Sequence, residues 1–343
     1  MSLKKKHKFL FLIILGLKLF STITIFQRDN KSSTLFSWAI DDTEELIYKY
    51  QKPLKIDRVF QYIYPDEFTS GSLDKYLFEM NKRNVSVYAM DGGYYWGTTD
   101  YGYEEFTSFV DQVGKYNSIN DELQIEGIVL DVEPAQDQDW KHNEDRLMKQ
   151  YVDNMIKAYQ YASSKNLKVV VCITYWYDEK HGAELRRLIE QGCDEVAVMN
   201  YCRGKEINLI ETEVSIAKEY NKPIINIFEF DKPDNEAVFD QNTYYHQGPY
   251  VAQEVFKEVD EYFEDKQVLT GGIDISQVES HIQTVTDVVA EVGDKINLPE
   301  SLTEAVKAMP DFELMSVIRE YGEASVKEIT IRLIALRLAD IVL

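Results

Sequence analysis

Two carboxylates end the run Gly127-Ile128-Val129-Leu130-Asp131-Val132-Glu133-Pro134. The residues before them are apolar, which is typical of a strand buried in a parallel sheet. Because side chains alternate between the two faces of a strand, Asp131 and Glu133 project to the same side. Two acids on one face at the end of a buried strand cost free energy unless they are used. The spacing therefore indicates acid chemistry at the carboxyl end of this strand.

Short β-rich runs alternate with amphipathic stretches from residue 34 onward, and we expect eight of each. Strands and helices that alternate in this way predict βαβ units and a parallel sheet. Eight units over roughly 250 residues match the size of a closed (β/α)8 TIM barrel. The rival is a doubly wound sheet, but no glycine-rich phosphate turn follows the first strand. The predicted strands are 35–40, 58–64, 85–90, 125–131, 168–174, 195–200, 223–230 and 268–275, and the predicted helices include 104–115, 146–164, 183–191, 207–220, 251–263 and 278–291.

The ends of the chain differ from this pattern. Residues 4–8 are Lys-Lys-Lys-His-Lys and an apolar run to Phe26 follows, so residues 1–33 are expected to be a signal peptide or an N-terminal membrane anchor with a spacer. This predicts a chain that is secreted or held on the extracellular face of the membrane. Residues 34–290 are assigned to the barrel. Residues 291–343 are predicted to form a C-terminal helical extension, whose apolar last segment would pack on the barrel or support self-association.

The composition limits the partners. The formal charge is −22 with a pI near 4.7, and no long basic cluster follows the first residues, so a nucleic-acid partner is disfavoured. A neutral or cationic substrate fits this charge better. The three cysteines cannot form a closed disulfide set, and no histidine lies near them at metal-ligand spacing. We therefore expect neither a metal nor another cofactor.

Polar and aromatic residues follow the predicted strands on one rim. Parallel strands bring their carboxyl ends to the same edge, so these side chains are expected to surround one mouth. Aromatic faces stack on sugar rings, and buried acids transfer protons to a glycosidic oxygen. The combination indicates a carbohydrate cleft, and a polysaccharide or other glycan is the expected partner. The candidate substrate-binding residues are Asp91, Trp96, Tyr175, Trp176, Asn200 and Glu229.

The fourth strand resembles the signature of glycoside hydrolase family 18, Asp-x-x-Asp-x-Asp-x-Glu. Glu126 stands at the first acid, Val129 at the second, Asp131 at the third and Glu133 at the catalytic glutamate. Asp91-Gly92-Gly93 is similar to the Ser-x-Gly-Gly element that ends the third strand of that family. Met199-Asn200-Tyr201-Cys202 resembles its Met-x-Tyr-Asp element on the sixth strand. The resemblance covers roughly residues 34 to 286, with three motifs in order at the expected strands.

The resemblance implies a chitinase-like TIM barrel that hydrolyses an N-acetylamino-sugar polymer with the help of its substrate. Glu133 would be the general acid, and the acetamido carbonyl of the sugar would attack the anomeric carbon. Asp131 would hold and polarise the acetamido group, and Tyr201 would hydrogen-bond it. The implied catalytic residues are therefore Glu133, Asp131 and Tyr201. A neighbouring carboxylate on the same face would raise the pKa of the acid by like-charge repulsion.

Three departures bear on the substrate. Val129 lacks the inner acid, Cys202 replaces the acid after Tyr201, and the eighth strand has no evident tryptophan for the floor of the sugar site. Trp176 or Trp96 is a candidate to stack on the sugar instead. Peptidoglycan or another amino-sugar polymer is therefore as open as chitin.

Other classes of function use the same residues. Retaining barrel glycosidases with two glutamates carry an acid/base Glu before Pro at the end of strand four and a nucleophile Glu at the end of strand seven, where Glu133 and Glu229 stand. A non-catalytic carbohydrate-binding barrel is the second alternative, because loss of the inner acid could leave binding intact. A third is a scaffold that assembles through its C-terminal helices.

Overall fold

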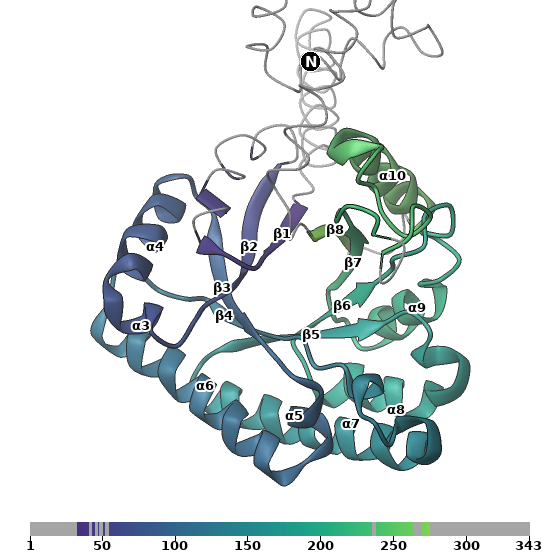
Figure 1. Cartoon of the computed structure of the whole chain (residues 1–343), viewed down its shortest axis with the longest axis horizontal. Helices are drawn as coiled ribbons and strands as arrows, with labels where there is room; N and C mark the ends of the chain where they lie inside the picture. The colour runs from purple at the N-terminus through teal and green to yellow at the C-terminus, as the bar shows by residue number, and fades with distance from the viewer. Residues whose placement is uncertain are drawn as a thin grey trace, which may run out of the picture.

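The computed structural model describes residues 33–274 apart from 41–42, 45–46, 48–50, 52–54, 235–237 and 264–268. In this part, eight parallel strands close into a barrel whose order around the ring follows the sequence. Helices surround the strands (Figure 1). The predicted (β/α)8 TIM barrel is therefore confirmed. The N-terminal signal or anchor and the C-terminal extension at 291–343 lie outside the described residues, as does the predicted helix 278–291.

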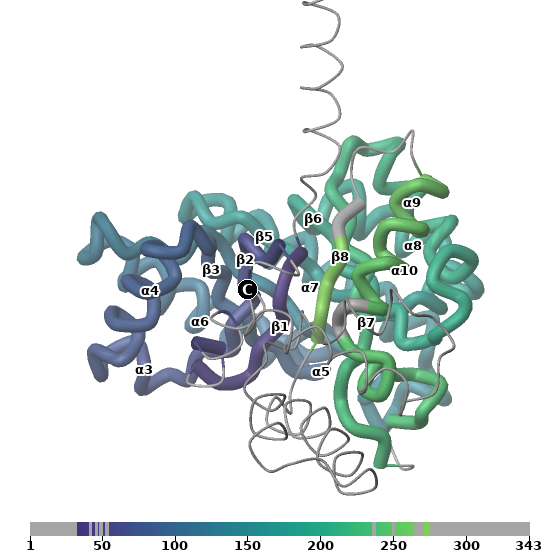
Figure 2. Tube along the Cα trace, turned by 90° about the horizontal axis from the view of Figure 1, so that it is seen from above, coloured from purple at the N-terminus to yellow at the C-terminus, as the bar shows by residue number. Residues whose placement is uncertain are grey.

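Each strand hydrogen-bonds to the next one along the chain, and β1 pairs with β8 to close the ring. Figure 2 shows β1 running beside β8. All eight predicted strands are present, with ends that shift by one to a few residues. Their bounds are β1 Ser33–Ser37, β2 Ile56–Tyr62, β3 Ser86–Asp91, β4 Gly127–Leu130, β5 Lys168–Thr174, β6 Glu195–Met199, β7 Ile224–Glu229 and β8 Leu269–Asp274.

The helices follow the strands and cover the outside of the barrel. Amphipathic α6 and α7 are longer than the predicted 104–115 and 146–164, and α8 begins six residues before the predicted 183. A short helix that was not predicted, α5, follows β3. The residues of α5 had been expected to lie on the rim of the barrel. The bounds are α3 Glu67–Ser70, α4 Ser72–Lys82, α5 Tyr94–Thr98, α6 Asp100–Ile119, η1 Pro134–Gln136, α7 Trp140–Ser164, α8 Tyr177–Gln191, α9 Glu211–Glu219 and α10 Gly248–Tyr262.

Alternation along each strand separates two apolar layers. One layer packs between the strands and the helices, and the other fills the inside of the barrel with a buried cluster that includes Phe60, Tyr88 and Val129. At the amino-terminal end of the barrel, Arg58 donates two hydrogen bonds to the Glu195 carboxylate, at 2.6 and 2.9 Å. The Arg58 guanidinium also lies 5.0 Å from the centre of the Phe60 ring. The interior below the carboxyl-terminal mouth is thus filled by side chains, which leaves the mouth as the place for chemistry.

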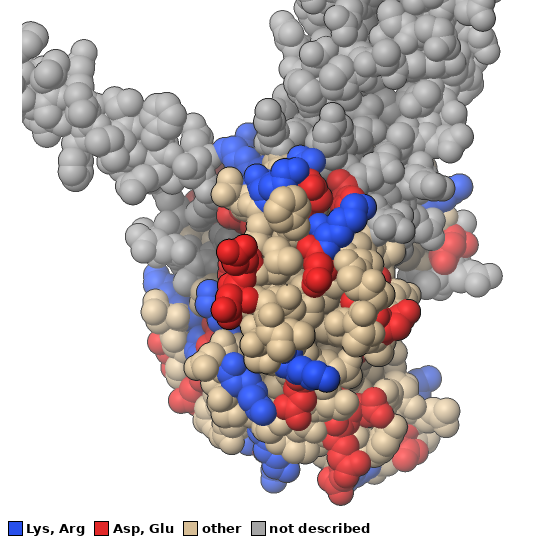
Figure 3. Space-filling view, turned by 90° about the vertical axis from the view of Figure 1, so that its left-hand side faces the viewer, with Lys and Arg blue, Asp and Glu red and all other residues tan. Residues whose placement is uncertain are grey.

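The outer surface carries charges of both signs. Figure 3 shows acidic and basic side chains interspersed on the side of the molecule that bears α3 and α4. Several are close pairs, such as Lys82 and Glu79 of α4, at 3.0 Å. Among the described residues, no helix is long and apolar enough to cross a membrane.

Candidate active site

Asp131 and Glu133 follow β4 at the mouth of the barrel. Val129 is 0% exposed and belongs to the cluster inside the barrel, whereas Val132 packs in the layer between strands and helices. This alternation sends the residues at 131 and 133 toward the mouth. Both acids are partly exposed there. The charge of Glu133 contributes to the raised pKa of Asp131.

Gly92 fixes how closely β3 approaches Asp131. The Asp131 N–H donates to the Asp91 carbonyl oxygen at 3.1 Å, directly beside this glycine. A Cβ atom at position 92 would lie 2.1 Å from the Asp131 carbonyl oxygen. No side chain fits in that space, so the backbone of Asp131 keeps its place only with glycine at 92. The Asp91-Gly92-Gly93 motif therefore has a steric role next to the acid pair.

Of the two acids, Asp131 has the larger shift in pKa. Burial raises its pKa to about 7, and the charges of Glu133 and Asp274 add to the effect. Its Oδ1 atom is shielded from solvent and has no hydrogen-bond partner among the described residues. An acceptor of this kind is costly to leave unpaired. Burial of this unpaired oxygen favours the protonated form of Asp131, in agreement with its raised pKa.

Glu133 has one close polar partner. Gln136, held by the short turn η1, donates from Nε2 to Glu133 Oε1 at 2.7 Å. Burial raises the pKa of Glu133, and the bond from Gln136 opposes this shift. Burial, rather than repulsion from Asp131, is thus the main cause, which corrects the sequence-based expectation. A carboxyl with a raised pKa holds its proton at higher pH, as a general acid must.

Asp274 lies at the centre of the mouth, and the sequence did not single it out as a site residue. It ends β8, where Tyr201 donates to its Oδ2 at 3.0 Å and Trp38 Nε1 donates to its Oδ1 at 3.2 Å. Burial raises its pKa to about 6, although the bonds from Trp38 and Tyr201 lower it. Gly272 faces the inside of the barrel, so Asp274, two residues later on the same strand, faces inward as well. This alternation is the signal in the sequence that could have identified Asp274. Its partner Trp38 is two residues beyond Phe36 of the barrel interior.

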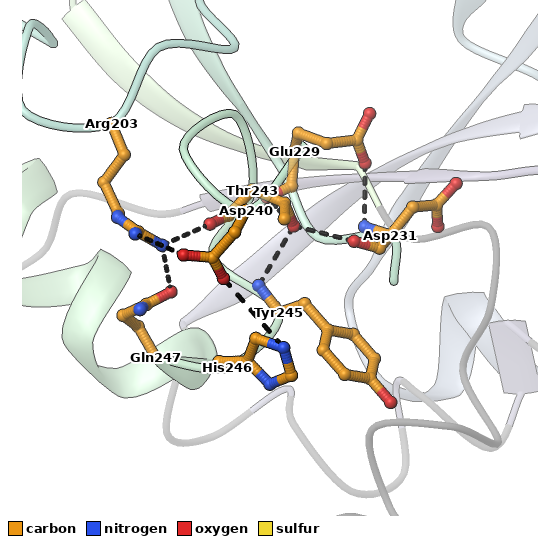
Figure 4. Close-up of polar contacts among 8 residues, drawn as sticks. All are labelled: Arg203, Glu229, Asp231, Asp240, Thr243, Tyr245, His246 and Gln247. Atoms are coloured by element: carbon orange, nitrogen blue, oxygen red, sulfur yellow. Dashed lines mark hydrogen bonds and ion pairs between the residues drawn. The ribbon is translucent and has the colours of Figure 1, made fainter. Parts of the chain in front are cut away.

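Glu229 ends β7 and is the direct partner of Asp274 in the pairing of β7 with β8. Burial raises its pKa to about 8, and the charge of Asp274 adds to the effect. Its Oε1 accepts the backbone N–H groups of Phe230 and Asp231, each at 2.8 Å. Figure 4 shows this side chain turned toward the backbone of the following loop. Glu229 thus holds the start of its own loop, whereas Glu133 is turned toward Gln136.

The loop after β7 is bound firmly to the end of β6. Arg203 donates from Nη1 to the Thr243 carbonyl oxygen at 2.8 Å and to Gln247 Oε1 at 2.5 Å, and from Nη2 to Asp240 at 3.3 Å. The Thr243 hydroxyl donates to the carbonyl oxygens of Glu229 and Asp231. Figure 4 shows these contacts converging on Thr243. They fix the loop against the strand ends that carry Tyr201 and Glu229.

Four predicted residues surround the mouth. Tyr201 reaches Asp274, and burial raises its pKa well above the usual range. Tyr175 follows β5, where Cys202 Sγ donates to its hydroxyl oxygen at 3.6 Å. Trp176 is partly exposed beside it and meets Trp140 edge-on, with ring centres 6.3 Å apart. Asp91 accepts the Gly92 N–H at 2.7 Å, and burial raises its pKa.

Two predicted substrate-binding residues lie away from the mouth. Trp96 is 4% exposed because α5 turns it into the layer between strands and helices, where it packs against Phe106 and Phe109. Its ring has no free face to stack on a sugar. Asn200 is 2% exposed and faces outward between Met199 and Tyr201, and its Nδ2 donates to the Glu206 carbonyl oxygen at 3.0 Å. Neither side chain can reach a ligand in the barrel.

No metal site accompanies the acids in the described part of the chain. There, no group of three or more His, Cys, Asp or Glu side chains has a geometry that could hold a metal ion.

No protein-family model matches the sequence, and a comparison with curated proteins finds no match. Solved structures do match. A GH18 chitinase from Pseudoalteromonas aurantia is 14% identical, with a TM-score of 0.45, and the match covers 75% of this chain and 99% of that one. A chitinase from Bacteroides thetaiotaomicron is 12% identical, with a TM-score of 0.44 and coverage of 72% and 89%. Family 18 chitinases are thus among the neighbours.

Barrels with other names match to the same degree. A xylose isomerase domain protein from Planctomyces limnophilus is 10% identical, with a TM-score of 0.46, and the match covers 78% of this chain and 97% of that one. The same fold carries many chemistries. The function of this chain must therefore be argued from the residues at its own mouth.

Proposed function

We propose that this chain is an exported glycoside hydrolase that cleaves an N-acetylamino-sugar glycan, chitin-like or peptidoglycan-like, with Glu133 as the general acid. The observation that carries the proposal is the acid pair on β4. Glu133 has a raised pKa, and the adjacent Asp131 has a pKa of about 7 and a shielded Oδ1 without a partner among the described residues. Such a pair can hold one proton near neutral pH and release it to a substrate.

The proposed roles are those that the resemblance to glycoside hydrolase family 18 implies for these residues. Glu133 donates its proton to the glycosidic oxygen while the acetamido carbonyl oxygen attacks the anomeric carbon and the bond to the leaving sugar breaks. The Asp131 carboxylate accepts a hydrogen bond from the acetamido N–H and so orients that group for attack. Water then attacks the anomeric carbon, opens the cyclic intermediate and returns a proton to Glu133. Because the anomeric carbon is attacked twice, its configuration is unchanged overall.

Asp274 and Trp38 complete the sugar site. Tyr201 and Trp38 both donate to Asp274, so the three side chains from β6, β8 and the end of β1 form one bonded group. Trp38 is partly exposed and lies beside β8, because β1 and β8 are paired. It supplies the aromatic floor that the end of the eighth strand lacks. Tyr201 orients Asp274 through the hydrogen bond from its hydroxyl.

The two-glutamate mechanism has less support. It needs Glu229 as a nucleophile, yet Glu229 Oε1 accepts two backbone N–H groups of its own loop. Its pKa of about 8 would leave it largely protonated at neutral pH, and a protonated carboxyl is a poor nucleophile. This scheme also gives Asp131 no task.

An experiment on the acetyl group tests the proposal. Wild-type protein is incubated with a β-1,4-linked N-acetylglucosamine hexamer and with the matched glucosamine hexamer, and products are separated by mass. Substrate assistance predicts cleavage of the acetylated hexamer only, because the other has no carbonyl to attack. The two-glutamate mechanism predicts that the amine hexamer is also cleaved, and that Glu229→Gln abolishes cleavage. A non-catalytic binding barrel predicts that neither is cleaved although the acetylated one binds.

A further inference from the structure

Gln61 is a fully buried polar side chain that the proposed mechanism does not use. It is 0% exposed and lies on β2, opposite Ser37 in the pairing of β1 with β2. Phe60 points into the barrel, so Gln61 points outward, into the layer between the strands and the helices. Its neighbours on the same face, Leu35 and Val59, are apolar. Burying an amide among such side chains costs free energy unless its polar atoms are bonded.

The Gln61 amide uses all of its hydrogen-bonding capacity. Its Nε2 donates to the Tyr62 carbonyl oxygen at 3.0 Å and to the Ser37 carbonyl oxygen at 3.3 Å. Its Oε1 accepts from the Tyr76 hydroxyl of α4 at 3.0 Å and from the Thr43 hydroxyl at 2.5 Å. Carbonyl oxygens only accept, so the NH2 group must face Ser37 and Tyr62, which fixes the orientation of the amide. No apolar side chain can serve these four partners.

These bonds hold the chain on both sides of Trp38. Gln61 binds the Ser37 carbonyl before it, and the Ala39 carbonyl after it accepts the Thr43 N–H at 3.1 Å. The Thr43 hydroxyl, which bonds Gln61, also lies 2.8 Å from that Ala39 oxygen. The Ser37 hydroxyl closes the group by a bond with the Thr43 hydroxyl. One buried set of bonds therefore fixes the backbone on either side of Trp38.

The position of Trp38 depends on this support. β1 ends at Ser37, which is its last residue paired with β2, so no strand pairing holds Trp38. Its indole Nε1 donates to Asp274 Oδ1 on β8 at 3.2 Å. A rotation of the backbone next to Trp38 would turn its ring away from Asp274. A buried polar network whose members are all bonded specifies a single conformation, which is what this contact requires.

We propose that Gln61 is a positioning residue that acts through Trp38: its amide fixes the backbone at Ser37 and so holds the Trp38 ring against Asp274 as the floor of the sugar site. Gln61 is fully buried and does not touch substrate. The proposal rests on the proposed function, because that function assigns the Trp38 ring to the sugar. The placement of this ring can nevertheless be measured without any glycan.

The first measurement follows the four tryptophans of the full chain. The chain is labelled with fluorotryptophan, and each fluorine NMR signal is assigned by replacing one tryptophan with phenylalanine. Gln61→Met keeps the length of the side chain but has no amide. We expect the Trp38 signal to shift or broaden, while the signals of Trp96, Trp140 and Trp176 stay in place. An unchanged Trp38 signal, or equal changes in all four signals, would overturn the proposal.

Tyr76→Phe is a milder variant of the same network. It removes only one donor to Gln61 Oε1, so it should move the Trp38 signal in the same direction by a smaller amount. It keeps the proposal testable if Gln61→Met does not fold. A Tyr76→Phe protein with an unchanged Trp38 signal would then count against the network.

Asn117→Leu is the matched control. The Asn117 amide also bonds the backbone, since it donates to the Ile125 carbonyl oxygen at 2.7 Å and accepts the Ile125 N–H at 2.9 Å. It lies in the last turn of α6, at the amino-terminal end of the barrel and away from the mouth. Asn117→Leu should lower Tm but leave the Trp38 signal unchanged. If it moves that signal as Gln61→Met does, Gln61 acts only through overall stability.

A double-mutant cycle tests whether Gln61 affects the sugar through Trp38. Calorimetry measures the binding of a β-1,4-linked N-acetylglucosamine hexamer to the Glu133→Gln protein, which is expected to bind without cleaving. In that background, Gln61→Met should weaken binding about 3- to 10-fold. The same change should have no further effect once Trp38→Ala is present, because the ring that Gln61 positions is gone. Losses that multiply in the combined variant would contradict a role through Trp38.

Failure of this proposal differs from failure of the proposed function. If the wild-type protein cleaves the hexamer but Gln61→Met leaves both the Trp38 signal and hexamer binding unchanged, Gln61 is not a positioning residue and the hydrolase proposal stands. If Gln61→Met moves the Trp38 signal but the wild-type protein neither binds nor cleaves the hexamer, the hydrolase proposal is wrong. The role of Gln61 in holding Trp38 then stands without the sugar.

Discussion

Tyr201 donates a hydrogen bond to Asp274 Oδ2 at 3.0 Å and so joins the ends of β6 and β8 across the mouth. Asp274, the direct partner of Glu229 in the pairing of β7 with β8, in turn raises the pKa of both Asp131 and Glu229. The mouth therefore holds one coupled row of carboxyl groups, from Glu133 through Asp131 and Asp274 to Glu229. A change at one of them is expected to shift the protonation of the others.

Replacing Tyr201 tests this coupling. Tyr201→Phe keeps the ring but removes the donor to Asp274, so the pKa of Asp274 should rise and the acetamido group should be held less well. We expect kcat to fall about 10- to 100-fold, the effect of losing one hydrogen bond to a charged group. The pH dependence of kcat should shift as well. An unchanged pH profile with reduced kcat would mean that the Tyr201 hydroxyl does not act through Asp274.

Asp131 should make the fold less stable as pH rises. Its pKa is about 7 in the folded chain but near 3.8 when unfolded, so between these values the folded state holds a proton that the unfolded state releases. Stability contributed by this group is therefore full below about pH 4 and lost by about pH 7. Asp131→Asn should gain about 4 kcal/mol over wild type as pH goes from 4 to 8, or about 10 °C in Tm.

Thermal unfolding of both proteins at several pH values measures that difference. The same variant should lose about 10²-fold in kcat, since it removes a charge that orients the substrate. A stability difference that is constant from pH 4 to pH 8 would show that Asp131 titrates normally.

Gly92 should be indispensable to activity without contacting substrate. A Cβ at this position would lie 2.1 Å from the Asp131 carbonyl oxygen, so Gly92→Ala must displace the strand end that carries the acid pair. Displacement on this scale costs about 10²-fold in rate. Gly182→Ala is the control, because a Cβ there meets nothing within 4 Å. Full activity of Gly92→Ala would contradict a steric role.

Arg203 should hold the loop after β7 in place. Arg203→Ala removes bonds to Thr243, Gln247 and Asp240, and should speed limited proteolysis between residues 238 and 247 several-fold. Arg203→Lys should restore only part of the protection, because a single ammonium cannot make the forked contacts. Arg186→Ala, which breaks an exposed pair with Glu219 elsewhere, should leave this cleavage unchanged. Equal proteolysis of all variants would contradict the clamp.

The barrel was predictable because its signal is local. Each strand is a short, mainly apolar run followed by an amphipathic stretch, and that succession is readable from the sequence alone. The acid pair was equally readable, because its spacing fixes one face. The sequence did not reveal that Trp96 is turned away from the mouth, because the residues after β3 form a helix that buries its ring. Asn200, which was also predicted to bind substrate, lies on the outward face between Met199 and Tyr201.

The contribution of Asp274 and Trp38 depends on distant parts of the chain. Their hydrogen bond joins residues 236 positions apart and exists only because β1 pairs with β8 when the barrel closes. Periodicity carries no information about such a contact.

The most direct test of the central claim is the rate at which Glu133→Gln cleaves a β-1,4-linked N-acetylglucosamine hexamer. Glutamine keeps the shape of the side chain and its contact with Gln136 but cannot supply a proton. We predict that kcat falls at least 10²-fold while calorimetry gives an unchanged Kd for the hexamer. Cleavage by this variant at the wild-type rate would contradict the assignment of Glu133 as the general acid.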